Sequence, residues 1–566
     1  MESFALKPGR GRQSLHFERE LAGCSALIAD GDNNSRSVLA RQLREFGFAE
    51  IVQHSRIRPA RELIETRRFD LILCAQYFGG DSPTGQDLLD GLQRDALLPF
   101  ATVFIMVTGD ASFTKVEQAA ESALDGYLLK PHSAAGLVQR LLAARRRKQE
   151  LADIFDALEQ RQLPQAILLC QQRYESRGVY WLYSARLGGE LLLRTAQFKQ
   201  AGALYQSVVS ATGEPWARAG VARALLSGGE FLQGTQTLLE LTQDAPNFAD
   251  AFDLLGRAQL KLGQLDLAMS SYRQASVLTP SSIARLQRLG KLAYYLGDAA
   301  EAALLLDQAT LLGQESRAFD FQTLALLALL RAAQEDWSGV QRCRDFAQAL
   351  LRKAPDIVRL RRIDRLIEGV ALLQQPSLGA ATAIAQDLAQ ALGAADFDFD
   401  LACNLLSLYS LLANAGAHLE HADGRIQQLG QRFCTSDATR SLLAAAAKAY
   451  EPFAQIIQRC DQHLLQQSEQ AMKLQLLGDL RGAIHGFLDL AAEHQNTRML
   501  DTARQLLQRH EGALADAAKY HERLKSLGAS IGVESPRPGS GEAQGRAPAG
   551  MVLRVSTPLP QATSHW

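Results

Sequence analysis

The sequence of 566 residues predicts two kinds of structure in succession. The first is an α/β doubly wound domain with a five-stranded parallel sheet, because five short apolar runs alternate with helical patterns before residue 150. The second is an all-α array of helical hairpins, because glycine, alanine and aromatic residues recur there at a fixed interval. The chain is also too long to bury a single compact core.

The elements of the α/β domain follow from the alternation of apolar runs and amphipathic stretches. We expect strands at residues 24–29, 50–54, 70–74, 102–108 and 126–129. We expect helices at residues 37–46, 59–67, 85–94, 113–123 and 134–150. Ligands of such sheets bind at the carboxyl ends of the strands, so candidate functional residues are sought there.

Three strand ends bear polar residues in a characteristic order. The segments are ADGDNNSR (29–36) after the first strand, MVTG (106–109) after the fourth, and GYLLKP (126–131) at the fifth. With them, residues 24–148 resemble the receiver domains of two-component response regulators. The resemblance implies that Asp30 is the first of two acidic metal-binding positions and that Tyr127 is the switch aromatic. It also implies that Thr108 and Lys130 contact a phosphoryl group.

The sequence departs from this family at positions that phosphorylation requires. Ala75 stands where the family has its phosphoacceptor aspartate, and a methyl group neither attacks a phosphoryl donor nor ligates magnesium. Gly31 stands at the second acidic position, with Asp32 displaced by one residue. Asp30 and Asp32 are the candidate metal ligands, but we expect no cofactor and no functional magnesium site.

The remaining receiver residues have structural interpretations as well. Lys130 can pair with Asp30 across an unphosphorylated cleft, and Thr108 can cap the following helix. Asp81, in the loop after the third strand, is the candidate substitute phosphoacceptor, although a solvated loop aspartate is the simpler interpretation. The basic run at 145–148 is interpreted as the solvated end of the last helix, where cations suit the helix dipole.

Residues 249–314 contain two helical hairpins in register, with Gly290 following Gly256 by 34 residues. The first glycine and the alanine of each hairpin allow its helices to approach closely. The second glycine ends the first helix in a left-handed conformation, and proline ends the second helix. The packing residues are Gly256, Gly263, Ala268, Tyr272 and Pro280, then Gly290, Gly297 and Ala302. The segment resembles tetratricopeptide repeats, which implies a solenoid with a peptide-binding groove.

The predicted organisation has five parts. They are a flexible leader at 1–21, a receiver-like domain at 22–150, tetratricopeptide-type repeats at 151–355, degenerate helical repeats at 356–526 and a disordered tail at 527–566. The tail is predicted from its Gly, Pro, Ser and Ala content.

The composition restricts the function. Lysine and arginine total 60 and acidic residues 61, which gives a net charge of −1 and no electrostatic footprint for nucleic acid. No apolar run is long enough to span a membrane, and the seven scattered cysteines suit a reducing, cytoplasmic location. No catalytic signature occurs, so we do not expect an enzyme.

These observations predict a bacterial two-component signalling adaptor. It would bind protein partners through the receiver face and the repeat groove, and a histidine kinase, another regulator or an effector enzyme are the candidate partners. The alternative is a phosphorylation-dependent regulator in which a substitute acceptor switches the output of the repeats.

Overall fold

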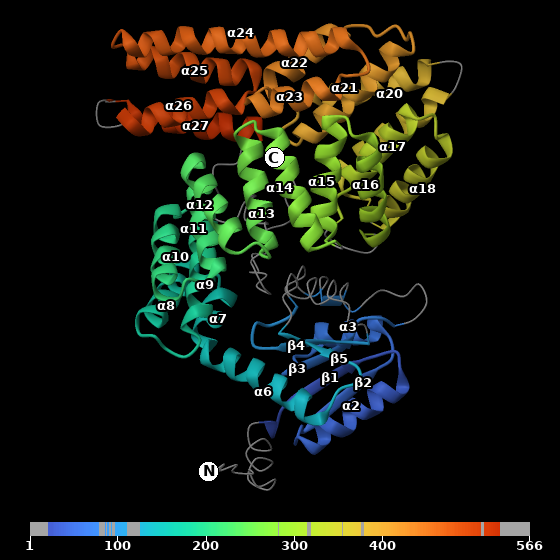
Figure 1. Cartoon of the computed structure of the whole chain (residues 1–566), viewed down its shortest axis with the longest axis vertical. Helices are drawn as coiled ribbons and strands as arrows, with labels where there is room; N and C mark the ends of the chain where they lie inside the picture. The colour runs from blue at the N-terminus through green and yellow to red at the C-terminus, as the bar shows by residue number, and fades with distance from the viewer. Residues whose placement is uncertain are drawn as a thin grey trace. The chain divides into compact units, whose positions relative to one another are not determined.

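The computed structural model describes most of the chain between residues 21 and 532 (Figure 1). The described residues are 21–78, 85, 88–89, 92, 97–109, 125–280, 282–313, 319–353, 355–374, 378–510, 514 and 516–532. They fall into two compact units that meet in the sequence at Gly228 and Gly229, and each unit is described by itself. Asp81, the predicted helix at 113–123 and nearly all of the predicted leader and tail lie outside the described residues.

The first unit begins with the predicted parallel sheet. Its strands are β1 Ser25–Ala29, β2 Glu50–His54, β3 Leu71–Ala75, β4 Val103–Thr108 and β5 Gly126–Leu129. Their order is β2-β1-β3-β4-β5, and every neighbouring pair is parallel. The five-stranded sheet predicted from the sequence is therefore confirmed, with strand ends within one residue of expectation.

Apolar side chains cover both faces of this sheet, as a parallel sheet requires. The helices around it include α2 Asn33–Glu45, α3 Ile57–Thr66 and α6 Ala134–Glu150. One face packs on leucines of α2 and α6, such as Leu39 and Leu141, and the other packs on Ala60 and Ile64 of α3. Successive strand residues point to opposite faces, so Ile28 belongs to the apolar layer under α2 and α6, and Leu27 to the layer under α3.

The basic run at the end of α6 is not solvated as predicted. Lys148 lies 2.8 Å from the carboxylate of Asp125 and donates a 2.6 Å hydrogen bond to the carbonyl of Thr102. Arg147 lies 3.2 Å from the same Asp125 carboxylate. The interpretation was wrong because the carboxylate that these cations contact precedes β5 and is distant in the sequence.

Helix α7, Ala152–Glu159, is fixed to the loop that precedes β4. The ring of Phe100 stacks on that of Phe155 at 5.6 Å, and the Phe100 N–H donates a 2.6 Å hydrogen bond to Glu159. The first unit continues through the helices α8 Leu163–Glu175, α9 Trp181–Arg194, α10 Phe198–Thr212 and α11 Pro215–Ser227.

The regular elements of the second unit, among its described residues, are helices. The helices in its first half are α12 Phe231–Asp244, α13 Ala249–Lys261, α14 Leu265–Leu278, α15 Ile283–Leu296, α16 Ala299–Gly313, α17 Gln322–Ala333, α18 Trp337–Lys353 and α19 Val358–Ala371. Those in its second half are α20 Gly379–Gln390, α21 Phe399–Asn414, α22 Ala422–Phe433, α23 Asp437–Ala446, α24 Glu451–Leu476, α25 Leu480–His494, α26 Thr497–His510 and α27 Ala517–Ile531. Short 3₁₀ turns follow α19 and α20 at Leu372–Gln374 and Ala391–Gly393.

The hairpin residues singled out in the sequence lie at helix ends and helix contacts. Gly263 and Gly297 have φ angles of 77° and 90° directly after the first helices, which is the left-handed region that favours glycine. A Cβ atom at Gly256 would lie 2.6 Å from the ring of Tyr272, and one at Gly290 would lie 2.8 Å from Leu306. Ala268 and Ala302 are fully buried. Helix α14 ends at Leu278, shortly before Pro280.

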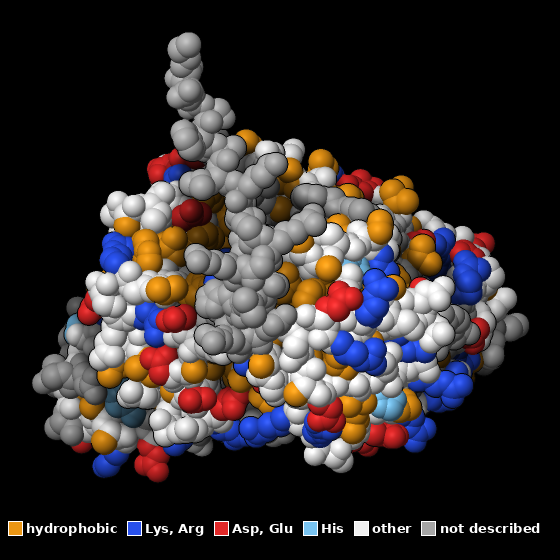
Figure 2. All heavy atoms as spheres, turned by 90° about the horizontal axis from the view of Figure 1, so that it is seen from below, with side chains coloured by type: hydrophobic (Ala, Val, Ile, Leu, Met, Phe, Trp, Pro, Cys, Tyr) orange, Lys and Arg blue, Asp and Glu red, His pale blue; other side chains and the backbone are white. Residues whose placement is uncertain are grey.

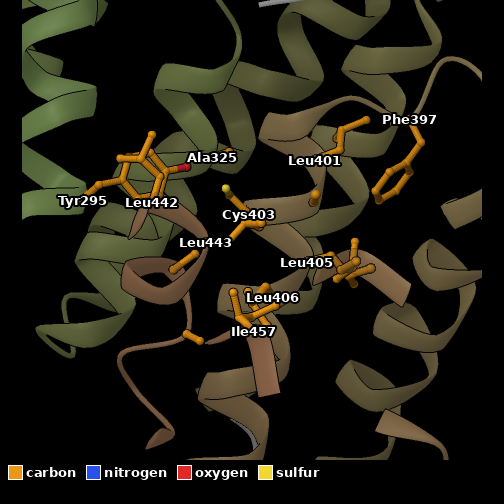
Figure 3. Close-up of a cluster of buried hydrophobic side chains, with 14 of the residues drawn as sticks. Tyr295, Ala325, Phe397, Leu401, Cys403, Leu405, Leu406, Leu442, Leu443 and Ile457 are labelled. Atoms are coloured by element: carbon orange, nitrogen blue, oxygen red, sulfur yellow. The ribbon is translucent and has the colours of Figure 1, made fainter. Parts of the chain in front are cut away.

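A continuous apolar core joins the two halves of the second unit. Figure 3 shows part of it, where Tyr295 of α15 and Cys403 of α21 lie among leucines that include Leu442 and Leu443 of α23. The last helix runs to Ile531, beyond residue 527, where the sequence predicts the tail to begin. That boundary was wrong because Gly528 and Ile531 are buried on the inner side of α27.

Candidate functional site

The candidate site lies at the carboxyl ends of the strands, where Asp30 follows β1. Asp30 is 2% exposed, so its carboxylate depends on protein partners. Its Oδ1 accepts a 2.9 Å bond from the Asp32 N–H, and its Oδ2 accepts a 2.6 Å bond from the Ser35 hydroxyl. Lys130 completes the set, with its Nζ 2.8 Å from Oδ2.

Lys130 is positioned by its own backbone. Its N–H donates a 2.7 Å hydrogen bond to the carbonyl of Thr108, which ties the segment after β5 to the end of β4. The Lys130–Pro131 peptide bond is cis. The ammonium group of Lys130 contacts the Asp30 carboxylate, so each charge is compensated within the protein.

The end of β3 contributes a methyl group to this cleft. Ala75 is 3% exposed and pairs with Val107 of β4 in the sheet. Gly85 packs over it, since a Cβ atom at Gly85 would collide with the Ala75 carbonyl and lie 2.8 Å from the Met106 sulfur. The carboxyl end of β3 at Ala75 is thus small, apolar and enclosed.

The space beside Gly31 is filled by the chain itself. A Cβ atom at Gly31 would lie 2.9 Å from the carbonyl oxygen of Phe78 and 3.3 Å from its Cα, so the backbone after β3 occupies the space of a side chain. Asp32 does not replace it, because its carboxylate caps α2 by accepting a 2.9 Å bond from the Asn34 N–H. Among the described residues, no group of three or more acidic, histidine or cysteine side chains could hold a metal ion.

The other two candidate residues lie on β4 and β5. Thr108 ends β4 and is 3% exposed. Tyr127 is the second residue of β5, where burial, with a smaller contribution from nearby Tyr77, raises the pKa of its phenol to about 12. The structure thus brings Asp30, Thr108 and Lys130 to one edge of the sheet, with Tyr127 further back on β5, while Asp81 lies outside the described part of the chain.

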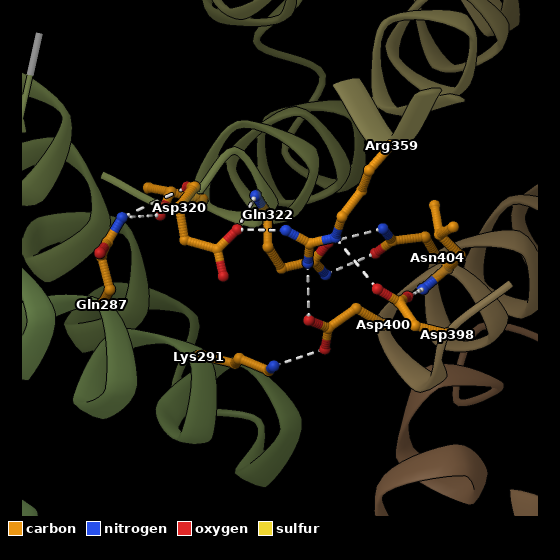
Figure 4. Close-up of polar contacts among 10 residues, drawn as sticks. Gln287, Lys291, Asp320, Gln322, Arg359, Asp398, Asp400 and Asn404 are labelled. Carbon is orange, nitrogen blue, oxygen red and sulfur yellow. Dashed lines mark hydrogen bonds and ion pairs between the residues drawn. The ribbon is translucent and has the colours of Figure 1, made fainter. Parts of the chain in front are cut away.

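A second polar cluster, in the helical unit, was not anticipated from the sequence (Figure 4). Arg359 at the start of α19 is 5% exposed and contacts three carboxylates. Its nitrogens lie 2.6 Å from Asp320, 3.0 Å from Asp398 and 3.0 Å from Asp400. Asp400 also pairs with Lys291 of α15.

This cluster closes one side of α15. In addition to the Lys291–Asp400 pair, the hydroxyl of Tyr294 lies 3.5 Å from that of Ser407 in α21. The ammonium group of Lys448, which follows α23, lies 5.2 Å from the centre of the Tyr294 ring. The side of α15 that bears Lys291 and Tyr294 is therefore packed against the same chain. One signal could have indicated it: Asp400 is the single charged residue of the apolar helix α21.

The surface shows mixed charge. Figure 2 shows Lys and Arg side chains among Asp and Glu side chains on the face in view, in keeping with the near-neutral total. Within the described ranges, none of the helices is both long and apolar enough to cross a bilayer.

Comparison with known proteins identifies the sheet domain. Residues 26–142 match the family model described as "Response regulator receiver domain". The chain is 28% identical to chemotaxis protein CheY of Pseudomonas aeruginosa over 115 residues, which cover 20% of this chain and 90% of CheY. It is also 28% identical to CheY-3 of Vibrio cholerae over 115 residues, which cover 20% of this chain and 86% of that protein.

A third relative has a longer chain. Over 127 residues, the sequence is 32% identical to the phosphate regulon transcriptional regulatory protein PhoB of Pseudomonas aeruginosa, covering 22% of this chain and 54% of PhoB. The family match ends at residue 142, within α6, and the sheet order and the contact of Lys130 with Asp30 agree with it. Residues 26–142 are therefore a receiver domain of two-component signalling.

Proposed function

We propose that the protein is a signalling adaptor whose receiver domain is not phosphorylated and whose output is the binding of other proteins. The main support is the pairing of Lys130 with Asp30 in a cleft where β3 ends in Ala75. In a phosphorylatable receiver, a lysine at this position contacts the phosphoryl group. Here the lysine has its counter-ion within the protein.

Three features of the cleft support this proposal in chemical terms. Ala75 offers no nucleophilic oxygen, so an aspartyl phosphate cannot form there. Gly31 provides no acidic side chain for a metal ion. The backbone of Phe78 fills the space beside Gly31, so an acidic side chain at this position would not fit. The carboxylate of Asp30 already accepts hydrogen bonds from Asp32, Ser35 and Lys130, and a magnesium ion would have to compete with the Lys130 ammonium group.

For the helical part we propose tetratricopeptide-type repeats that serve as a protein-binding scaffold. The support is the regular start of the helices α13 and α15, 34 residues apart, and the close contact of Gly256 with Tyr272. The inner side of α15 is packed against α21 and the end of α23, so a partner of the repeats would use another surface. A histidine kinase, another regulator or an effector enzyme in the cytoplasm is the expected kind of partner.

The proposal is tested by capture of partners on the immobilised full chain. Extracts of the source cells are passed over the protein with magnesium alone and with magnesium plus beryllium fluoride, which imitates a phosphoryl group on aspartate. We expect the same partners in the same amounts under both conditions. Capture that depends on beryllium fluoride would contradict the proposal and favour the phosphorylation-dependent alternative, and a failure to capture any protein would contradict both.

A further inference from the structure

The second half of α24 has an exposed apolar stripe. Leu465 is 38% exposed, Met472 is 38% exposed and Leu476 is 85% exposed, and Leu477, which follows the helix, is 82% exposed. A surface helix usually has polar side chains on the face that meets water. An exposed apolar surface of this kind on a helix is typical of an interaction site.

The opposite side of the same segment packs against the rest of the unit. Leu464 and Ala471 are buried, and Ala471 lies close to Gly486 of α25, where an added Cβ atom would be 3.3 Å from the Ala471 methyl group. Figure 1 shows α25 along one side of α24 in this region. In the part of the unit that the structure describes, Leu476 and Leu477 have little cover, so the stripe is available to a partner.

The spacing of the stripe is that of a helix-pairing seam. Leu465, Glu469, Met472 and Leu476 follow one another at i, i+4, i+7 and i+11, which places them on one face. This spacing reads the same in both directions along the helix. An identical helix laid antiparallel across the stripe would therefore present the same positions in reverse order.

We propose that α24 binds α24 of a second copy of this chain in an antiparallel, two-fold symmetric pair. Leu465 would then lie opposite the partner's Leu476, and Glu469 opposite the partner's Met472. A two-fold interface uses the same patch on both subunits, so each of these contacts occurs twice. The inference is independent of whether the receiver is phosphorylated.

Charge complementarity favours a second copy over an unrelated protein. Glu469 and Lys473 are exposed, and no ion pair within the described residues involves either of them. In the antiparallel pair, Glu469 lies one residue from the position that faces the partner's Lys473, which is within reach of both long side chains. The neighbouring exposed residues Gln466 and Gln470 are neutral and add no like charges to the seam.

The proposal is tested with the full chain by analytical ultracentrifugation over a range of concentrations. Wild-type protein is expected to reach twice the monomer mass. Leu476→Asp should remain monomeric, because it would bury a charge against the partner's Leu465. Leu304→Asp on α16, a leucine that is 69% exposed, is the matched control and should still dimerise. A wild-type monomer at every concentration, or a dimer that tolerates Leu476→Asp, would overturn the proposal.

Charge reversal tests the antiparallel register. Glu469→Lys or Lys473→Glu alone should raise the dissociation constant about tenfold, because two exposed attractive pairs become repulsive. The double variant, with both reversals, should restore wild-type dimerisation. Circular dichroism of each variant verifies that the helices are intact. Single variants without effect, or a double variant no better than the singles, would overturn the antiparallel pair.

Discussion

The ammonium nitrogen of Lys130 lies 2.8 Å from the carboxylate of Asp30, across a cleft in which residue 75 is alanine. The two residues are 100 positions apart and come from the ends of β5 and β1. The pair is enclosed on the Asp30 side, so each partner compensates a charge that would otherwise be costly to bury. The Lys130–Asp30 pair therefore supports the proposal that this receiver domain is not phosphorylated.

The pair is predicted to stabilise the receiver domain. Lys130→Met keeps the side-chain stem but leaves the Asp30 carboxylate without a cation, and we expect a loss of about 1–3 kcal/mol in the free energy of unfolding. Urea denaturation measures it. Arg58→Met is the control, because Arg58 pairs with Glu62 on the surface of α3 and its removal should change stability little. Equal effects of the two substitutions would contradict a structural role for Lys130.

Restoring a carboxylate at the end of β3 is predicted not to restore metal binding. Ala75→Asp adds one acidic side chain, but Gly31 still lacks a ligand and the Phe78 backbone still occupies its space. Isothermal titration with magnesium should therefore detect no strong binding. Tight, stoichiometric magnesium binding by this single variant would show that the missing ligand at Gly31 does not prevent metal binding.

The Arg359 cluster is predicted to hold the helical unit together. Arg359→Met would leave Asp320, Asp398 and Asp400 without their shared cation, and the expected cost is about 3–5 kcal/mol, as for other buried pairs that lose one partner. Arg365→Met on the same helix is the matched control, because Arg365 is exposed and its pairs with Glu368 and Asp387 lie at the surface end of that side chain. Hydrogen exchange should accelerate in α21 for the first variant and stay unchanged for the second. Unchanged exchange in both would contradict this role.

The Asp253 carboxylate on α13 is predicted to make stability depend on pH in the acid range. Burial raises its pKa, but Arg288 and Arg285 together outweigh this effect, so the pKa lies below the usual value. A lowered pKa in the folded state means stability that is present above the unfolded pKa of about 3.9 and is lost as pH falls through the folded value.

Asp253→Asn should therefore destabilise the protein at neutral pH, and its deficit should shrink as the pH falls below about 4. Thermal unfolding of both proteins from neutral to acid pH measures the difference. A deficit that stays constant across this range would mean that the carboxylate charge is not responsible.

The sequence was sufficient to predict the five strands and the polar residues at their carboxyl ends, because both depend on local patterns. Five apolar runs predicted β1 to β5, and the order of Asp30, Thr108 and Lys130 along the chain predicted their meeting at one edge. The start of α2 came earlier than expected, at Asn33, because Asp32 acts as its cap rather than as a free acidic residue.

What could not be predicted depends on residues that are distant in the sequence. The Lys291–Asp400 pair joins positions 109 residues apart, and a repeat pattern does not indicate which distant helices pack against each other. The contact of Phe78 with Gly31 is a backbone contact, which no side-chain pattern shows. The basic run at 145–148 resembled a solvated helix end because the carboxylate of Asp125 lies on another element.

The most direct test of the adaptor proposal is the intact mass of the purified protein after incubation with acetyl phosphate and magnesium. The account predicts no added phosphoryl group, under conditions in which a receiver with an aspartate at the end of β3 serves as positive control. An added group on this protein would contradict the account. If that group disappeared in Asp81→Asn, the chain would be a phosphorylated regulator with a substitute acceptor.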